Sequence, residues 1–165
     1  ILSSFSDIKE NIMKYSHSSS IFSIEINDYQ ITSKLIEGNY PNYNKVIPET
    51  TSSEIAVDKN VLKNSLNIIS KVVNQQYKGV KLTPNNNSMH LISSNTESEI
   101  GEDQIDVDYT GEEISIGFNI SYLQDVIDTL DGDTVHICIN DQNSGCIIKD
   151  KHDSDSTFVI MPMRV

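Results

Sequence analysis

The sequence predicts an α+β fold in which antiparallel sheet carries two helices on one side. Most apolar residues alternate with polar ones, which is the period of a half-buried strand. Two segments change to the helical period, and clusters of Ser, Asn, Asp and Gly separate the segments as turns do. The expected strands cover residues 11–17, 20–27, 30–37, 53–58, 79–83, 88–94, 104–109, 112–118, 134–140, 145–150 and 157–164.

The first expected helix begins after Asp58, because aspartate accepts hydrogen bonds from the free N–H groups of a first helical turn. Its apolar stripe contains Val61, Leu62, Leu66, Ile69, Val72 and Val73. Between residues 59 and 77 there are lysines but no acid. Lysine and amide side chains suit phosphate contact that reads no sequence. The alternative is that a short helix lacks acids by chance or through codon usage.

The second expected helix begins after Asn119 and stops before Gly132. Its apolar stripe contains Ile120, Leu123, Val126, Ile127 and Leu130. From residue 53 on, the expected order is one strand, a helix, four strands, a helix and three strands. The second part of the chain therefore consists of two similar halves, each a helix followed by several strands.

A domain boundary is expected near residues 47–53, where Pro48 precedes a polar stretch. Residues 1–48 read as the end of a preceding domain, 49–52 as a linker, and 53–165 as a complete domain. Because the sequence opens on Ile1 without Met, it reads as a fragment of a longer protein.

The charge is unevenly distributed along the chain, whose formal net charge is −12. Residues 1–82 are almost neutral, whereas nearly all of the negative charge lies in residues 83–165. The overall sign argues against a protein that simply coats nucleic acid. Two surfaces with different partners would explain the asymmetry, and a solvated acidic face is the alternative. No apolar run approaches the ~20 residues of a membrane span, which predicts a soluble protein with no membrane partner.

Signatures of enzymes are absent from the sequence. It contains no P-loop, dinucleotide-binding or G-x-S-x-G motif. The four histidines, His17, His90, His136 and His152, are scattered, so no metal or cofactor is expected. Cys138 and Cys146 read as packed residues more than as a disulfide, and His136 near Cys138 is thin support for a catalytic thiol.

Residues 157–165 form an apolar segment that ends in Met161-Pro162-Met163-Arg164-Val165. Pro162 cannot donate to a ladder, so the segment must leave the sheet or lie on its edge. Two methionines beside a proline make an adaptable apolar surface of the type that accepts varied peptides. Simple core filling is the alternative.

Three motifs resemble the β sliding clamps of bacterial DNA polymerase III. They are residues 38–48 (GNYPNYNKVIP), 117–123 (GFNISYL) and 159–165 (VIMPMRV), with support from 32–35 and 78–82. The resemblance covers the whole chain in order. It implies the DNA-clamp (processivity) fold, with antiparallel sheets outside and two helices per domain facing the DNA hole. On this reading, residues 1–48 belong to the middle domain of three and residues 53–165 are the third.

The resemblance further implies a non-catalytic processivity factor rather than an enzyme. Two subunits would form a ring around duplex DNA, without sequence specificity, in the bacterial cytoplasm at the nucleoid. The implied partners are the second subunit, the DNA polymerase III alpha subunit, the clamp loader and other proteins that carry clamp-binding motifs. An acidic β-rich interaction module without a DNA role is the second hypothesis, and an enzyme is a distant third.

The residues that match the family's peptide pocket come from the linker region, the second helix and the end of the sequence. They are Pro41, Lys45, Val46, Asn119, Tyr122, Asn143, Gly145, Val159, Ile160, Met161, Pro162, Met163 and Arg164. Lys45 stands where the family often has arginine, which puts bidentate contacts there in doubt. Asn143 and Gly145 suggest a shallower floor. Because the other wall would come from the middle domain, peptide affinity should be reduced in this chain.

Two further sets match other surfaces of the family. Lys59, Lys63 and Lys78 match the DNA-facing side, whereas Asp125 and Asp128 make the second helix a weaker candidate for DNA contact. The subunit interface is matched by Lys71, Val72, Val73, Glu97, Glu99, Glu102 and Asp103. In such an interface the acids would steer association, and the two valines would carry much of the affinity.

Overall fold

The computed structural model describes residues 13–39, 42–48, 50–151 and 153–165. The chain divides into two compact units, Ile1–Pro41 and Asn42–Val165. Each unit is described by itself. The expected domain limits at residues 48 and 53 stay a prediction.

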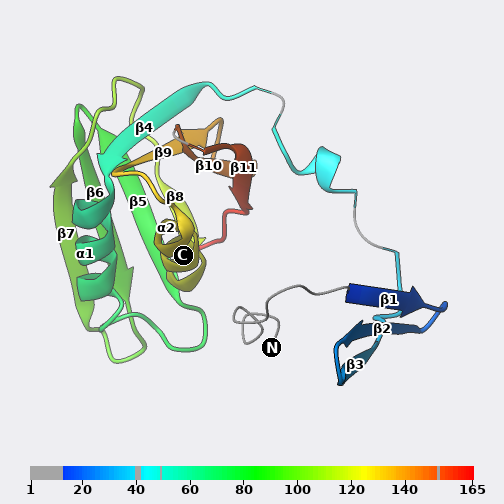
Figure 1. Cartoon of the computed structure of the whole chain (residues 1–165). Helices are drawn as coiled ribbons and strands as arrows, with labels where there is room; N and C mark the ends of the chain where they lie inside the picture. Colours follow the sequence, from blue (N-terminus) through cyan, green and yellow to red (C-terminus); the bar gives the residue numbers. More distant parts are fainter. Residues whose placement is uncertain (1–12, 40–41, 49, 152) are drawn as a thin grey trace. The chain divides into compact units, whose positions relative to one another are not determined.

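The first unit contains a three-stranded antiparallel meander (Figure 1). Its strands are β1 (Met13–His17), β2 (Ile21–Ile26) and β3 (Tyr29–Lys34), which confirms the three expected strands within the described residues. Asn27 adopts a left-handed conformation with φ of 52° at the tight turn between β2 and β3, where asparagine is tolerated. Among the described residues of this sheet, Ile26 alone is buried.

The second unit repeats the order βαβββ twice after a short 3-10 helix, η2 (Tyr43–Lys45), and this confirms the two similar halves. The first repeat is β4 (Ser53–Asp58), α1 (Lys59–Ile69), β5 (Gly79–Asn85), β6 (Ser88–Ser94) and β7 (Ile100–Asp106). The second repeat is β8 (Ile116–Asn119), α2 (Ile120–Thr129), β9 (Thr134–Ile139), β10 (Cys146–Asp150) and β11 (Asp153–Ile160).

The two repeats interlock by exchanging their first strands. The sheets have the orders β7-β6-β5-β8 and β11-β10-β9-β4, and every described pairing is antiparallel. Strand β4 therefore completes the sheet of the second repeat, and β8 completes that of the first. This exchange makes a single folding unit of the two repeats.

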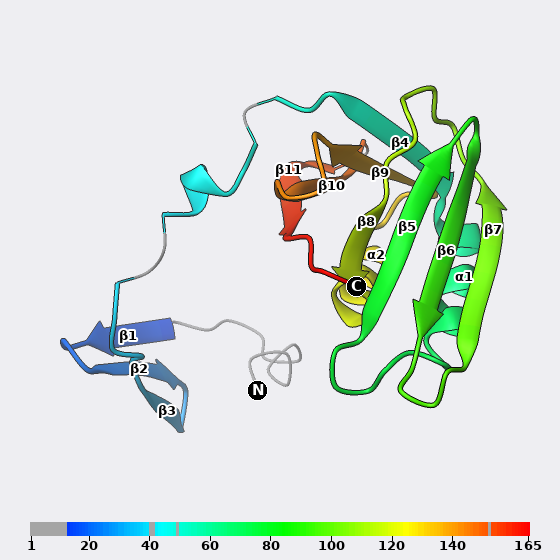
Figure 2. The same ribbon diagram turned by 180° about the vertical axis from the view of Figure 1, so that it is seen from behind.

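Helix α1 packs on β6, β7 and α2, and Figures 1 and 2 show it on one face of the β5–β7 strands. The expected caps are confirmed: Asp58 accepts from the Val61 N–H at 2.9 Å, and Asn119 accepts from the Ser121 N–H at 2.9 Å. The apolar faces of both helices, with Leu66 on α1 and Leu123 on α2, pack into one continuous core with residues from both sheets. Fully burying one such leucine contributes about 1.5–3 kcal/mol.

The first helix ends at Ile69, so the expectation that it continues through Val73 was wrong. After Ile69 the chain tightens, because the N–H groups of Lys71 and Val72 bond to carbonyls three residues back, at 3.2 and 3.1 Å. Val72 thereby leaves the helix and packs on Gly101 of β7, where an added Cβ would overlap the Val72 side chain.

Several strand limits also differ from the expectation. Strand β3 ends at Lys34 instead of 37, β5 at Asn85 instead of 83 and β7 at Asp106 instead of 109, and β11 begins at Asp153 instead of 157. Strand β7 begins at Ile100 instead of residue 104, because its pairing with β6 continues from Ser88 to Ser94. The acidic residues of β7 interrupt the alternation of apolar and polar residues, so the sequence does not indicate the start of this strand. A strand at the edge of a sheet tolerates such charges. Strand β8 begins at Ile116 instead of 112, and β11 ends at Ile160 ahead of Pro162.

Candidate functional site

The segment of residues 161–165 lies against strand β8. The Met163 N–H donates to the Gly117 carbonyl oxygen at 2.8 Å. At Gly117 an added Cβ would overlap both the Met163 carbonyl oxygen and Val165 Cγ2. The segment thus leaves β11 at Pro162, as the sequence predicted, and is held by a neighbouring strand.

A cavity of about 300 Å³ borders this segment. It is lined by Asn74, Tyr77, Gly79, Ser94, Asn95, Thr96, Met163, Arg164 and Val165. Met163 and Arg164 belong to the expected pocket. Tyr77 was not singled out, although its ring is 62% exposed beside these residues. The sequence feature that could have indicated Tyr77 is that it is the one aromatic residue in an otherwise polar turn.

A second cavity, of about 320 Å³, lies between the linker and the β9–β10 turn. It is lined by Lys45, Val46, Pro48, Thr50, Asn140, Ser144, Gly145 and Met161. A Cβ at Gly145 would lie 2.8 Å from the Val46 carbonyl oxygen and 3.1 Å from Val159 Cγ1. The structure therefore brings together linker residues and residues near the end of the chain that are far apart in sequence.

Asn140 fixes the linker at this cavity. Its Nδ2 donates to the Thr50 carbonyl oxygen at 2.5 Å, and its Oδ1 accepts from the Ser52 N–H at 2.6 Å. Sequence reasoning missed Asn140, because an amide at the end of a strand carries no local signal of such a role.

Several of the expected pocket residues line neither of these two cavities. Ile160 is buried in the core, 4% exposed, opposite Cys146. The Asn143 backbone belongs to the β9–β10 turn, where its N–H donates to Asp141 at 2.7 Å. Tyr122 is 59% exposed on the first turn of α2. Pro41 lies outside the described residues.

The expected DNA-facing lysines follow the seam between α1 and α2. Lys59 Nζ donates to the Leu130 carbonyl oxygen, and Lys63 Nζ lies 2.6 Å from Asp128 Oδ1. The Lys78 carbonyl oxygen accepts from the Ile120 N–H at 2.8 Å. The three lysines thus run from the end of α2 to its start. The Lys63 and Asp128 side chains remain 43% and 57% exposed.

The expected interface residues gather at the end of α1 and along β7, an edge strand. Lys71 and Glu97 line one cavity of about 370 Å³. Asn95 orders the turn before β7, accepting from the Glu97 and Glu99 N–H groups at 2.9 and 3.1 Å. Ile100, which was not singled out, is 64% exposed beside Gly101 and adds an apolar side chain to this surface.

Hydrogen bonds or burial shift the pKa values of several titratable groups elsewhere in the second unit. Hydrogen bonds to His136 and Lys151 hold the pKa of Glu54 below its ordinary value of 4.5, with Oε1 at 2.7 and 3.2 Å from the two nitrogens. Burial raises the pKa of Cys138, and raises that of Cys146 to about 12. Neither thiol is activated as a nucleophile would be. Among the described residues, no cluster of metal-ligating side chains occurs and no helix is long and apolar enough to span a membrane.

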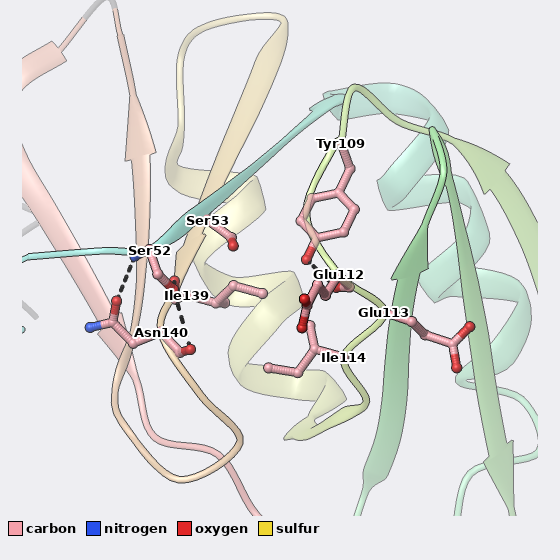
Figure 3. Close-up of a pocket in the computed structure, with 8 residues that line it drawn as sticks. All are labelled: Ser52, Ser53, Tyr109, Glu112, Glu113, Ile114, Ile139 and Asn140. Carbon is pink, nitrogen blue, oxygen red and sulfur yellow. Dashed lines mark hydrogen bonds between the residues drawn. The ribbon is translucent and has the colours of Figure 1, made fainter.

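A further cavity, of about 310 Å³, lies between the start of β4, the end of β9 and the loop before β8 (Figure 3). It is lined by Ser52, Ser53, Tyr109, Glu112, Glu113, Ile114, Ile139 and Asn140. The Tyr109 hydroxyl donates to the Glu112 carbonyl oxygen at 2.6 Å. No residue of the expected pocket lines it.

Two interlocked βαβββ repeats, whose two helices contact each other, define a domain of the DNA-clamp type. A family model described as "DNA polymerase III beta subunit, C-terminal domain" matches residues 44–164. The beta sliding clamp of Haemophilus influenzae is 35% identical over 142 residues, which cover 86% of this chain and 39% of that protein. The clamp of Vibrio cholerae is 33% identical over 141 residues, covering 86% and 38%.

Among solved structures, the sliding clamp of Bartonella birtlesii bound to griselimycin has a TM-score of 0.83 and 29% identity, and the match covers 93% of this chain and 41% of that one. The chain therefore belongs to the family of DNA polymerase III beta subunits. It spans about two fifths of the length of the curated relatives it matches.

Proposed function

We propose that this chain supplies the third domain, and part of the second, of a bacterial sliding clamp. Two complete subunits would form a ring around duplex DNA and tether the replicative polymerase without catalysing a reaction. The protein would act in the cytoplasm, at the nucleoid. The family assignment and the interlocked repeats support this proposal.

For DNA, the proposed surface is the seam between α1 and α2. Its three lysines are half-buried, and the side chains of Lys59 and Lys63 already have protein partners, so they would make weak contacts that allow sliding. The edge strand β7 and the end of α1 would meet the second subunit. Acidic residues there would orient association, and Val72 would supply apolar contact.

The observation that carries the proposal is the meeting of Lys45, Val46, Gly145 and Met161 at one cavity. Val159 lies directly against Gly145, and the segment that bears Met163 follows Met161. Apolar and adaptable methionine side chains suit linear motifs of several partners. These partners would be the alpha subunit of the polymerase, the clamp loader and other proteins with clamp-binding motifs. Because griselimycin is bound to the Bartonella clamp, we propose that it also binds this chain.

Titration of griselimycin and of a polymerase-tail peptide into the 165-residue chain, by calorimetry, tests the pocket. Met161→Ala and Met163→Ala should each weaken binding about tenfold, because a truncated apolar anchor at a binding centre costs more than 1 kcal/mol. Met13→Ala, an exposed methionine on β1, is the matched control and should bind as the wild type does. Unchanged affinity of both pocket variants would reject the site, and no binding of either probe would reject the function.

A further inference from the structure

Two glycines form a floor under the Val165 side chain. A Cβ at Gly79 would lie 3.0 and 3.1 Å from the two Val165 methyl carbons, and one at Gly117 would overlap Val165 Cγ2. Neither glycine has a positive φ, because Gly38 is the one glycine of the described residues that does. Their backbones would therefore accept any residue, and it is the space above them that excludes a side chain.

The internal repeat shows what this space is used for. Ala56 lies two residues before the cap of α1, and Gly117 lies two residues before the cap of α2. In the first repeat, Ala56 pairs with Asp108 through backbone hydrogen bonds of 3.0 and 2.8 Å. In the second repeat, Gly117 occupies the equivalent position and pairs with Met163. The same strand position thus carries a methyl group in one repeat, and in the other lacks it where Val165 is seated.

We propose that Gly79 and Gly117 form a seat for Val165 that positions Met163 and Arg164 for peptide binding. This inference rests on the proposed function. Val165 and the two glycines are positioning residues here, and the methionine and arginine beside them would touch the peptide. A segment that already has its ligand-binding conformation in the free protein loses less conformational entropy when the ligand binds. The seat would therefore raise affinity by holding Met163 and Arg164 in place.

Gly117→Ala tests the seat directly. The added methyl overlaps the Met163 carbonyl oxygen and Val165, so the segment must leave β8. Hydrogen exchange of the Met163 amide should become fast, while the amides of β9 and β10 stay protected and show that the domain is folded. Affinity for griselimycin and for the polymerase-tail peptide should fall about tenfold. Ala56→Gly, the same position in the first repeat, is the control and should leave both Met163 protection and affinity unchanged.

Gly79 and Val165 provide a second test that does not risk the fold. Of the side-chain and backbone atoms near a Cβ at Gly79, the three closest all belong to Val165. Gly79→Ala should therefore weaken binding severalfold in the wild-type background, and should have no further effect when Val165 is already Ala. Additive effects of the two substitutions would contradict the seat.

Other outcomes also separate the two proposals. If Gly117→Ala frees the Met163 amide but leaves affinity within about twofold of the wild type, the segment's position does not govern binding and the inference is wrong. If the Met163 amide stays protected in Gly117→Ala, the glycine is not needed for the seat. Absence of binding by the wild-type chain would instead overturn the proposed function, and the positioning role with it.

Discussion

The carboxylate of Glu54 shows how a single residue links pH to stability. Hydrogen bonds to His136 and Lys151 lower its pKa in the folded chain, so the folded state binds the proton less tightly than the unfolded state. The resulting stabilisation is present above the unfolded pKa near 4.5 and is lost as the pH falls through the lowered folded pKa. We expect Glu54→Gln to lose less stability than the wild type between about pH 6 and pH 3.

Urea unfolding midpoints at the two pH values measure this difference. It should stay below about 1 kcal/mol, because the Glu54 side chain is 46% exposed and solvent screens the pair. Glu112→Gln, an exposed glutamate in the loop before β8, is the control. An equal loss of stability between pH 6 and pH 3 in the wild type and in Glu54→Gln would show that the contacts of Glu54 with His136 and Lys151 add no stability.

Among single residues, roles that depend on neighbours in the sequence could be predicted, and roles that depend on contacts between distant residues could not. The caps Asp58 and Asn119 could be identified because a cap depends on residues within one helical turn. Gly79 and Gly117 could not, because their role depends on Val165, which reaches them only after the sheet has formed. Asn140 escaped notice for the same reason, since Thr50, the linker residue that it holds, precedes it by 90 residues.

An acidic residue of helix α2 pairs with a lysine of α1 on the surface proposed for DNA. Because Asp128 contacts Lys63, we expect Asp128→Asn to free this lysine and tighten binding to duplex DNA severalfold at low salt. The slope of log K against log salt should steepen by up to about 0.9, the value for one added phosphate contact. Fluorescence anisotropy of a labelled duplex at several salt concentrations measures both quantities.

Asp125→Asn separates this local effect from a general change of charge. It removes the same charge from the same helix, but Asp128 is the carboxylate that Lys63 contacts. Equal effects of the two substitutions would mean that only net charge matters. No effect of either would argue against DNA contact along the seam.

Among the elements, the period of the apolar residues predicted both helices and the order of all ten strands and helices after the linker. Their ends were less predictable. The stripe through Val72 and Val73 continues the helical period, yet the helix ends at Ile69. Val72 packs on β7 instead, because Gly101 leaves room for its side chain. The exchange of β4 and β8 between the sheets has no signal in the sequence, since pairing between distant strands is decided by the whole core.

On the scale of the whole molecule, the two units differ in how much apolar surface they bury. The core residues of the second unit all lie between Ile55 and Ile160 and come from both repeats. In the described part of the first unit, Ile26 alone is buried, and an isolated small sheet without an apolar face is at best marginally stable in water. The second unit should therefore fold without the first.

Residues 42–165 expressed alone test this expectation. Their thermal unfolding, followed by circular dichroism, should be cooperative, with a midpoint within about 2 °C of that of the 165-residue chain. Residues 1–41 alone should show no cooperative transition, because Ile26 is the one buried residue in the part of this unit that the structure describes. A midpoint lower by more than about 4 °C, which corresponds to about 1 kcal/mol for a chain of this size, would mean that the second unit depends on the first for stability. The griselimycin affinity of the shortened chain then shows whether the proposed pocket functions without residues 1–41.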